Sequence, residues 1–378
     1  MKIIIIGTAY PYRGGLAAFN ERLAREFVAE GHDVKMMTFT LQYPNFLFPG
    51  KTQYSEENPP RDLCIERCIH SVNPFNWIKV GRQLKKEKAD WVVFAYWMSF
   101  FAPCFGTIAR LARRPDTRMV ALVHNMIPHE PTLLDKLFPR YFINGMDRFV
   151  ALSASVADDI DRLDRHRKPK AVSPHPVYDN YGALATREEA AEKLGLRTSD
   201  RYLLFFGFIR RYKGLDLLLD ALADPRLKTL PIKLLVAGEF YDKPEFYLNK
   251  IKALRLEDRV ILHSDFIPDD RVRYYFSLAD MVVQPYRSAT QSGVSQIAYH
   301  FEKPILVTKV GGLPEIVPDR KVGYVVDIDP ERIADALVDF YTHGRAAEFA
   351  PHIKEEKKKY LWSCMTEKIM DKSKRRSL

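Results

Sequence analysis

Two series of short apolar runs, each alternating with helix-length segments, constrain the fold of this chain more than any other feature. The runs of the first series are 2–7, 34–39, 91–97, 119–124 and 148–152, and those of the second are 202–206, 232–237, 260–263, 281–284 and 304–308. Runs that are apolar throughout are typical of strands buried on both faces of a parallel sheet. The alternation therefore predicts an α/β protein with two doubly wound parallel-sheet, Rossmann-like domains.

The length of 378 residues accommodates two such domains, because single hydrophobic cores stop growing before this size. We place the first domain at residues 1–180 and the second at 181–355, with the linker between Tyr178 and Ala191. Residues 356–378 carry Trp362 and Met365 among basic side chains. This segment is expected to form a C-terminal helix that packs back on the N-terminal domain, with a frayed basic end.

Composition narrows the class of protein. The four cysteines are scattered and favour a reducing compartment, and KIIIIG follows Met1 without a secretory signal, so a cytoplasmic location is expected. The apolar stretch 91–111 is interrupted by Pro103 and is interpreted as a buried strand followed by a buried helix, not as a membrane span.

The formal net charge of +10 favours an anionic partner. No recognised nucleic-acid-binding motif accompanies the charge, so an anionic substrate or the surface of an anionic membrane is preferred to nucleic acid. Residues 73–88, NPFNWIKVGRQLKKEK, mix aromatic and basic side chains. They form either a peripheral membrane contact or a solvated amphipathic helix.

Residues 205–214, FFGFIRRYKG, lead from a strand through Gly207 into a helix start. Helix starts carry unpaired N–H groups, and positive charge beside them favours a phosphate or diphosphate. Arg210 and Lys213 are placed to meet such a group from one side, whereas Arg211 is expected to be solvated. The alternative is an ordinary strand–helix junction with solvated basic residues.

Further glycine turns follow other strands, at the edge where open α/β sheets bind ligands. Gly14 and Gly15 follow the first strand, and Gly311 and Gly312 follow the run at 304–308. Each lets backbone approach a ligand closely or serves as a packing turn. Glu315 lies near the next helix start, where it contacts the ligand or caps the helix.

The segment after the run at 281–284 offers neutral hydrogen-bonding groups. Thr290, Gln291 and Ser292 precede a helix start at Gly293 and Val294, whose amides are expected to face the ligand.

The first domain contributes His124 at the end of an apolar run, where its ring is expected to point toward the ligand, although a lone strand-end histidine is often structural. His129 and Glu130 follow in the loop, and they contact the acceptor or brace the turn.

No metal site is expected. Asp327 and Asp329 match a DxD pattern, but Asp329 precedes Pro330 and Glu331 as the N-cap of a helix would. Cys64, Cys68 and His70 share one strand face without a second pair of ligands.

Taken in order, several of these segments resemble the retaining glycosyltransferases of family 4, which have the two-domain GT-B fold. The matching segments are YPYRGG (10–15), VHN (123–125), HPVYDNY (175–181), FFGFIRRYKG (205–214), VAGEF (236–240), PYRSATQSGV (285–294) and VGGLPEIV (310–317). They span nearly the whole chain.

The resemblance implies transfer of a hexosyl group from a UDP- or GDP-sugar to a glycan or lipid-linked glycan, without metal or cofactor. Arg210 and Lys213 would stabilise the leaving diphosphate with help from Gly15 and the amides at 292–294, which is electrostatic stabilisation of developing charge. His124 would bind the donor sugar, and Glu239 would lie near the nucleotide. The second domain would hold the donor. The first would face the acceptor, with Tyr12, Arg13, His129 and Glu130 as candidate contacts.

The chain departs from the family pattern at two places. Ala289 and Ile297 occupy the positions of a glutamate pair that the family usually has, and Phe208 follows Gly207 where an arginine is usual. The missing glutamate pair keeps open the alternative of a catalytically silent nucleotide-sugar-binding protein. A GT-B nucleotide-sugar epimerase is a second enzyme alternative.

Overall fold

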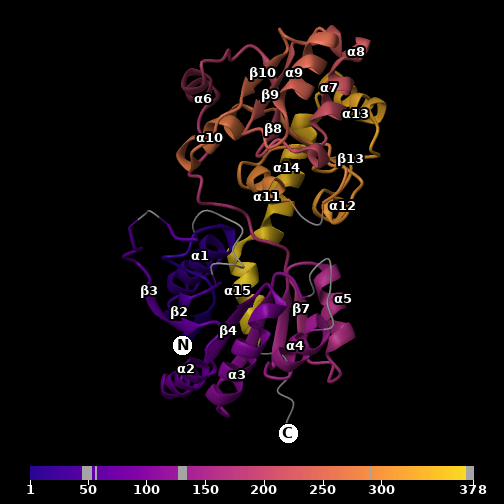
Figure 1. The fold of residues 1–378 in the computed structure, drawn as a ribbon. Coiled ribbons are helices and arrows are strands. Elements are labelled where there is room, and N and C mark those ends of the chain that lie inside the picture. Colours follow the sequence, from indigo (N-terminus) through magenta and orange to yellow (C-terminus); the bar gives the residue numbers. More distant parts are fainter. Residues whose placement is uncertain (45–52, 56–57, 127–133, 290–291, 372–378) are drawn as a thin grey trace. The chain divides into compact units, whose positions relative to one another are not determined.

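The computed structural model describes residues 1–44, 53–55, 58–126, 134–289 and 292–371, and divides the chain into two compact units. The first unit is Met1–His175 with Trp362–Leu378, and the second is Pro176–Leu361 (Figure 1). Each contains one sheet whose strands pair in parallel, flanked by helices. The predicted fold class, two doubly wound parallel-sheet domains, is confirmed.

The first unit is built on a seven-stranded sheet, counted over its described residues, in the order β3-β2-β1-β4-β5-β6-β7. The strands are β1 (Lys2–Ile6), β2 (Asp33–Leu41), β3 (Cys64–His70), β4 (Trp91–Tyr96), β5 (Arg118–Val123), β6 (Arg148–Ala151) and β7 (Lys170–Val172). The helices are α1 (Gly15–Ala29), α2 (Pro74–Lys86), η2 (Ser99–Phe101), α3 (Ala102–Ala112), α4 (Leu134–Ile143), α5 (Ala154–Leu163) and α15 (Trp362–Met370).

The side chains of β1 alternate between two hydrophobic layers, as the period of a strand requires. Ile3 and Ile5 pack with α1 and α15, whereas Ile4 and Ile6 pack with α2, α3 and α5. Along α1, Phe19, Leu23 and Phe27 are buried at helical spacing. They form one layer with Trp362, Met365 and Ile369 of α15, which lies beside α1 (Figure 1). The C-terminal segment thus forms a helix in the core of the first unit.

The second unit has a six-stranded sheet over its described residues, in the order β10-β9-β8-β11-β12-β13. The strands are β8 (Arg201–Phe206), β9 (Ile232–Ala237), β10 (Val260–His263), β11 (Met281–Gln284), β12 (Ile305–Thr308) and β13 (Gly323–Val326). The helices are α6 (Arg187–Leu194), η3 (Arg211–Lys213), α7 (Leu215–Leu222), α8 (Pro225–Lys228), α9 (Pro244–Ala253), α10 (Asp269–Leu278), α11 (Gly293–His300), α12 (Leu313–Ile316), α13 (Pro330–Thr342), α14 (Arg345–Lys357) and η4 (Lys358–Tyr360).

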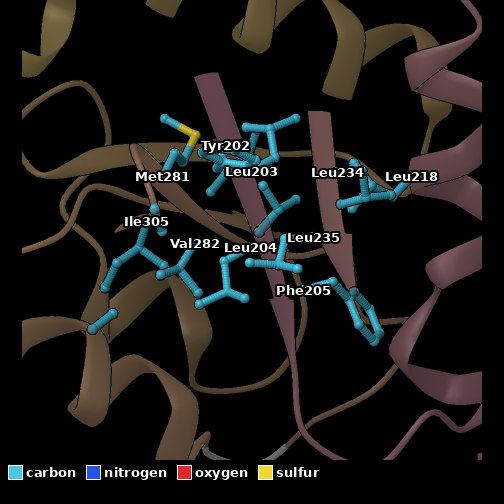
Figure 2. Packing of buried hydrophobic residues seen from close by; sticks show 14 of the residues in the cluster. Tyr202, Leu203, Leu204, Phe205, Leu218, Leu234, Leu235, Met281, Val282 and Ile305 are labelled. Atoms are coloured by element: carbon cyan, nitrogen blue, oxygen red, sulfur yellow. The ribbon is translucent and has the colours of Figure 1, made fainter. Parts of the chain in front are cut away.

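One hydrophobic cluster holds the second unit together. Figure 2 shows its centre, where Leu204 of β8 lies between Leu235 of β9 and Val282 of β11, with Leu203 next to it along β8. These four side chains are at most 1% exposed. Full burial of such an aliphatic side chain contributes about 1.5–3 kcal/mol, so the central strands are fixed firmly enough to position the loops that follow them.

Two interpretations of ambiguous segments are confirmed. Residues 91–112 form β4, η2 and α3, a strand followed by helix, and no helix among the described residues is long and apolar enough to span a bilayer. Asp329 is the N-cap of α13 and accepts a hydrogen bond from the Glu331 backbone N–H at 2.9 Å, with Pro330 at the first helical position.

Candidate functional site

In the second unit, β8 and β9 end in glycine turns that touch backbone to backbone. Gly207 has φ +89° and Gly238 has φ +139°, in the left-handed region that favours glycine. The Gly207 N–H donates to the Ala237 carbonyl at 2.8 Å. A Cβ atom on Gly238 would lie only 2.5 Å from the Gly207 carbonyl oxygen. Glycine at 238 is therefore required by packing, and the two strand ends form one rigid edge.

The loop after β8 is also fixed to the segment after β11. Gly214 has φ +70°, and a Cβ atom there would lie 1.9 Å from the Pro285 carbonyl oxygen. Arg287 donates two hydrogen bonds to the Asp216 carboxylate, at 2.7 and 2.8 Å. Because β8 and β11 flank the point where the strand order reverses, these contacts build the edge where doubly wound sheets bind ligands.

Lys213 places a buried ammonium group at this edge. The side chain is 8% exposed, and its Nζ lies 5.7 Å from the Tyr286 ring centroid. It also lies 3.0 Å from the position that a Cβ atom on Gly207 would take. Among the described residues, no carboxylate forms an ion pair with Lys213. Burial, followed by the charge of Arg210, lowers the pKa of Lys213 to about 8. A buried cation without a counter-ion is costly and favours an anionic ligand.

Arg210 lies beside Lys213 and is held by an aromatic ring. Its guanidinium carbon is 3.9 Å from the centroid of Tyr241, which packs edge-on against Phe208 at 5.7 Å. Arg211 is exposed and lies over Phe246 at 5.0 Å, so the expectation that Arg211 is solvated is confirmed. Lys213 and Arg210, which are expected to meet a diphosphate, thus differ from Arg211 in burial and in the aromatic ring that each contacts.

The start of α11 presents backbone to the same edge. The Ser292 hydroxyl is turned inward and donates to Oε1 of Gln284, whose Nε2 donates to Ser295 at 2.9 Å. Among the described residues, no backbone carbonyl accepts from Gly293 or Val294, as is usual for the first N–H groups of a helix. Thr290 and Gln291 lie outside the described residues.

The two positions of the missing carboxylate pair are filled by apolar side chains. Ile297 is 5% exposed in the core of the second unit, and Ala289 is half-buried against that core. A carboxylate at position 297 would therefore be buried and would require a change in packing.

The remaining candidates of the second unit flank this edge. Gly311 has φ +47°, and Gly312 is the N-cap of α12. Glu315 is exposed and lies in the first turn of α12, where a negative charge is favourable at a helix start, so both its alternatives, a ligand contact and a helix-start carboxylate, stay open. Glu239 is partly exposed, and its backbone carbonyl accepts from the Ile209 N–H at 2.8 Å.

In the first unit, the turn after β1 leaves open space. Gly14 has φ +108° and is the N-cap of α1, and its carbonyl accepts from Ala17 and Ala18. Both Gly14 and Gly15 are exposed, and a Cβ atom on either would have no atom of a described residue within 4 Å. Packing against the described residues of this unit therefore does not require glycine at 15.

Tyr12 and Arg13 of the same turn differ in accessibility. Tyr12 is 3% exposed, and its hydroxyl accepts from the Gln42 N–H at 3.1 Å. Arg13 is exposed, with its backbone N–H donated to Gln53 at 3.0 Å. Tyr12 thus braces the turn, and only Arg13 offers a side chain to solvent.

His124 follows β5 and continues its hydrogen-bond ladder through its N–H, which donates to Tyr96 at 2.8 Å. Its ring lies edge-on to Phe19 at 4.8 Å, and Phe19 makes a similar contact with His175. The Nε2 atom is buried and has no hydrogen-bond partner among the residues that the structure describes. Burial, and then the neighbouring His175, lower the pKa of His124 to about 3, so the ring is neutral at physiological pH. His129 and Glu130 lie outside the described residues.

His175 was not singled out from the sequence. Its position beside His124 depends on the path of the segment that follows β7, which a local pattern does not reveal. The only available signal was its place at the start of HPVYDNY.

Comparison with known proteins identifies the class. The model of "Glycosyltransferase Family 4" matches residues 13–180, and that of "Glycosyl transferases group 1" matches residues 200–343. The chain belongs to the family 4 glycosyltransferases and has the GT-B fold.

Similar proteins agree with this assignment over most of the chain. The N-acetyl-alpha-D-glucosaminyl L-malate synthase of Bacillus anthracis is 23% identical, covering 89% of this chain and 87% of the relative. The D-inositol 3-phosphate glycosyltransferase of Paenarthrobacter aurescens is 28% identical, covering 89% and 86%. Among solved structures, Anabaena HepE in complex with UDP is 15% identical with a TM-score of 0.70, covering 98% of both chains.

Proposed function

We propose that this glycosyltransferase moves a hexosyl group from a UDP- or GDP-sugar to a glycan or lipid-linked glycan, with retention of configuration and without a metal ion or other cofactor. The buried Lys213 ammonium, without a carboxylate partner among the described residues, carries the proposal. The solved structures of Anabaena HepE with UDP and with UDP-glucose support a nucleotide-sugar donor by analogy of fold.

The positive edge of the second unit suits the leaving group. In the transfer, the bond between the anomeric carbon and the diphosphate oxygen breaks, and its electron pair remains on the diphosphate. An acceptor hydroxyl forms the new glycosidic bond on the same face, and its proton passes to the departing phosphate oxygen. Lys213, Arg210 and the amides of Gly293 and Val294 would stabilise the negative charge that develops, which is the largest catalytic contribution in many enzymes.

His124 would contact the donor sugar as a neutral ring. Its pKa of about 3 means that it can both donate and accept a hydrogen bond at neutral pH without adding charge. A sugar hydroxyl would supply the hydrogen-bond partner that the buried Nε2 lacks among the described residues. Gly15 leaves the space through which the donor would approach α1.

Without the carboxylate pair, other groups would have to contact the donor. Since Ala289 and Ile297 pack on the core, contacts with sugar and ribose would come from backbone at the start of α11, with Gly311, Gly312, Glu315 and Glu239 at the flanks. Asp329 caps α13, so this part of the DxD pattern already has a structural role.

A thermal-shift screen tests the donor. UDP, GDP and ADP and their sugar conjugates are compared with and without EDTA, because a ligand that binds the folded state raises the melting temperature. We expect one nucleotide family to raise it equally in EDTA. The matching nucleotide-sugar is then incubated with glycan acceptors, and the anomeric configuration of the product is read by NMR. Inversion, dependence on a metal, or conversion of the donor in the absence of an acceptor would contradict the proposal.

A further inference from the structure

The outward face of α2 in the first unit carries an apolar end and a basic end. Phe75 and Ile78 are followed by Lys79, Arg82, Lys85 and Lys86, spaced by three or four residues so that they form one stripe along the helix. All six side chains are exposed, Phe75 by 85% and Ile78 by 36%. The opposite face, with Val80, Gly81 and Leu84, is buried. We call the six residues the α2 stripe.

The exposure of Phe75 is built into the fold, because the start of α2 is firmly held. The Asn73 side chain caps the helix by accepting from the Phe75 and Asn76 N–H groups at 3.0 and 3.3 Å. Asn76 accepts from the His70 N–H at 2.8 Å, and the Trp77 indole donates to the His70 carbonyl at 2.8 Å. Phe75 therefore points outward from a rigid first turn.

The body of the helix is equally fixed. A Cβ atom on Gly81 would lie 2.7 Å from the Leu111 Cβ of α3, so the two helices pack at the closest distance that glycine allows. The stripe cannot turn inward without breaking this contact. It presents its side chains to whatever lies outside the first unit.

The charge of the stripe is uncompensated. None of its four basic side chains forms an ion pair with a described residue. The nearest acidic residue in sequence, Glu87, is already paired with Lys2 and Lys35. An anionic partner is therefore favoured. Nucleic acid would satisfy the lysines but would gain little from an exposed phenylalanine and isoleucine, whereas a lipid surface uses both.

We propose that the α2 stripe binds the surface of an anionic phospholipid membrane, with Phe75 and Ile78 entering the interface and the lysines and arginine facing the headgroups. Because β3 leads directly into α2, the apolar end lies at the carboxyl edge of the sheet, the edge that carries Gly14, Gly15 and His124. A lipid-linked acceptor would meet the enzyme there. This last link rests on the proposed function, whereas lipid binding itself does not.

Sedimentation of the full-length protein with vesicles tests the proposal without reference to activity. We expect binding to vesicles that contain phosphatidylglycerol, little binding to phosphatidylcholine alone, and release by salt. Since each basic side chain near such a surface contributes about 1 kcal/mol, Lys85→Gln/Lys86→Gln should lower the partition coefficient about 25-fold. Phe75→Ser should lower it about tenfold.

Matched variants elsewhere serve as controls. Lys354→Gln/Lys358→Gln removes the same charge from two exposed lysines of the second unit, and Leu184→Ser removes a side chain that is 58% exposed. Neither should change vesicle binding by more than about twofold, and thermal melts should show that all variants remain folded. No binding to phosphatidylglycerol, or equal losses in the controls, would overturn the proposal. Binding of short RNA or DNA that depends on the lysines but not on Phe75 would overturn it in favour of nucleic acid.

Discussion

Lys213 is a buried lysine of the second unit and Lys303 a half-buried one, and desolvation is the main cause that lowers the pKa of each to about 8. They differ in partner. Lys303 donates to the Ser277 carbonyl at 3.0 Å, whereas Lys213 has a ring, a glycine turn and a second cation as neighbours. The same shift thus accompanies a structural lysine at one position and an unsatisfied cation at the other. Only the unsatisfied cation at Lys213 is an argument for a ligand.

The pKa of Lys213 predicts how diphosphate affinity depends on pH. Below pH 8 the ammonium is present and binding needs no proton. Above pH 8 the free protein carries a neutral amine, so binding must take up a proton and affinity falls by up to about tenfold per pH unit. Lys213→Arg should abolish this decline, because arginine does not titrate in this range. Calorimetric titrations of nucleotide between pH 7 and 9.5 would measure both, and a flat profile for the unmodified protein would contradict the assignment.

Tyr241 is expected to act as a positioning residue for Arg210. A stacked cation–π pair contributes about 1 kcal/mol, so Tyr241→Ala should weaken nucleotide binding about fivefold, and Tyr241→Phe should restore it. Phe246→Ala removes the equivalent ring beneath Arg211 and should change the affinity less than about twofold. Equal losses in Tyr241→Ala and Phe246→Ala, measured by nucleotide titration, would show that the stacking on Tyr241 has no special role.

At the scale of elements, two glycine turns distinguish the energetic cost of a packing clash from the cost of backbone strain. Gly214 and Gly195 have similar φ values, +70° and +68°, but only Gly214 has a backbone oxygen in the way of a Cβ atom. Gly195→Ala should therefore lower the free energy of unfolding by about 1 kcal/mol from strain alone. Gly214→Ala should lower it by more than about 3 kcal/mol, because the Pro285 segment must move. Urea unfolding compares the free energies of unfolding of the two variants. Equal effects would mean that the Pro285 segment moves at little cost.

Strands with continuous apolar runs could be predicted from the sequence, because burial on both faces leaves a strong signal. Residues 232–237, 260–263 and 281–284 were predicted with the boundaries of β9, β10 and β11. Three edge strands, β3, β7 and β13, were not in the series, whereas the edge strand β10 was predicted because its sequence VILH is an apolar run. β7 is short, with two of its three residues exposed, and β13 begins at Gly323 and is only half-buried at its end. Edge strands are defined by pairing with a neighbour, and that tertiary information is not visible in a local pattern.

The candidate site was predictable to the level of loops and not of side chains. FFGFIRRYKG indicated a basic glycine turn, but only packing shows Lys213 buried and Arg211 exposed. Ser292 was singled out for its hydroxyl, which the structure turns inward to Gln284. Tyr12 looked available in its loop and is buried. In each case the direction of one side chain is decided by neighbours far away in the sequence.

At the scale of the whole molecule, the chain returns to its first unit through α15. Trp362 is 4% exposed and packs on Phe19 at 5.0 Å, and Phe19 contacts both His124 and His175. Trp362→Ala should lower the free energy of unfolding of the first unit by about 3–5 kcal/mol. Leu361, the preceding residue, is 39% exposed, so Leu361→Ala should lower the free energy of unfolding by less than about 1 kcal/mol. Urea unfolding would compare the two variants, monitored by far-ultraviolet circular dichroism because this signal does not rely on tryptophan fluorescence. A similar small cost for both would mean that α15 does not support this core.

The central claim is that the edge of the second unit binds a nucleoside diphosphate through Lys213. Its most direct test is calorimetric titration of UDP and GDP, and of uridine and guanosine, into the purified protein in EDTA. We predict that one diphosphate binds at least about tenfold more tightly than its nucleoside, that Lys213→Met removes this difference, and that Lys303→Met keeps it while lowering stability. Equal affinity for nucleoside and diphosphate, or an unchanged diphosphate affinity in Lys213→Met, would contradict the claim.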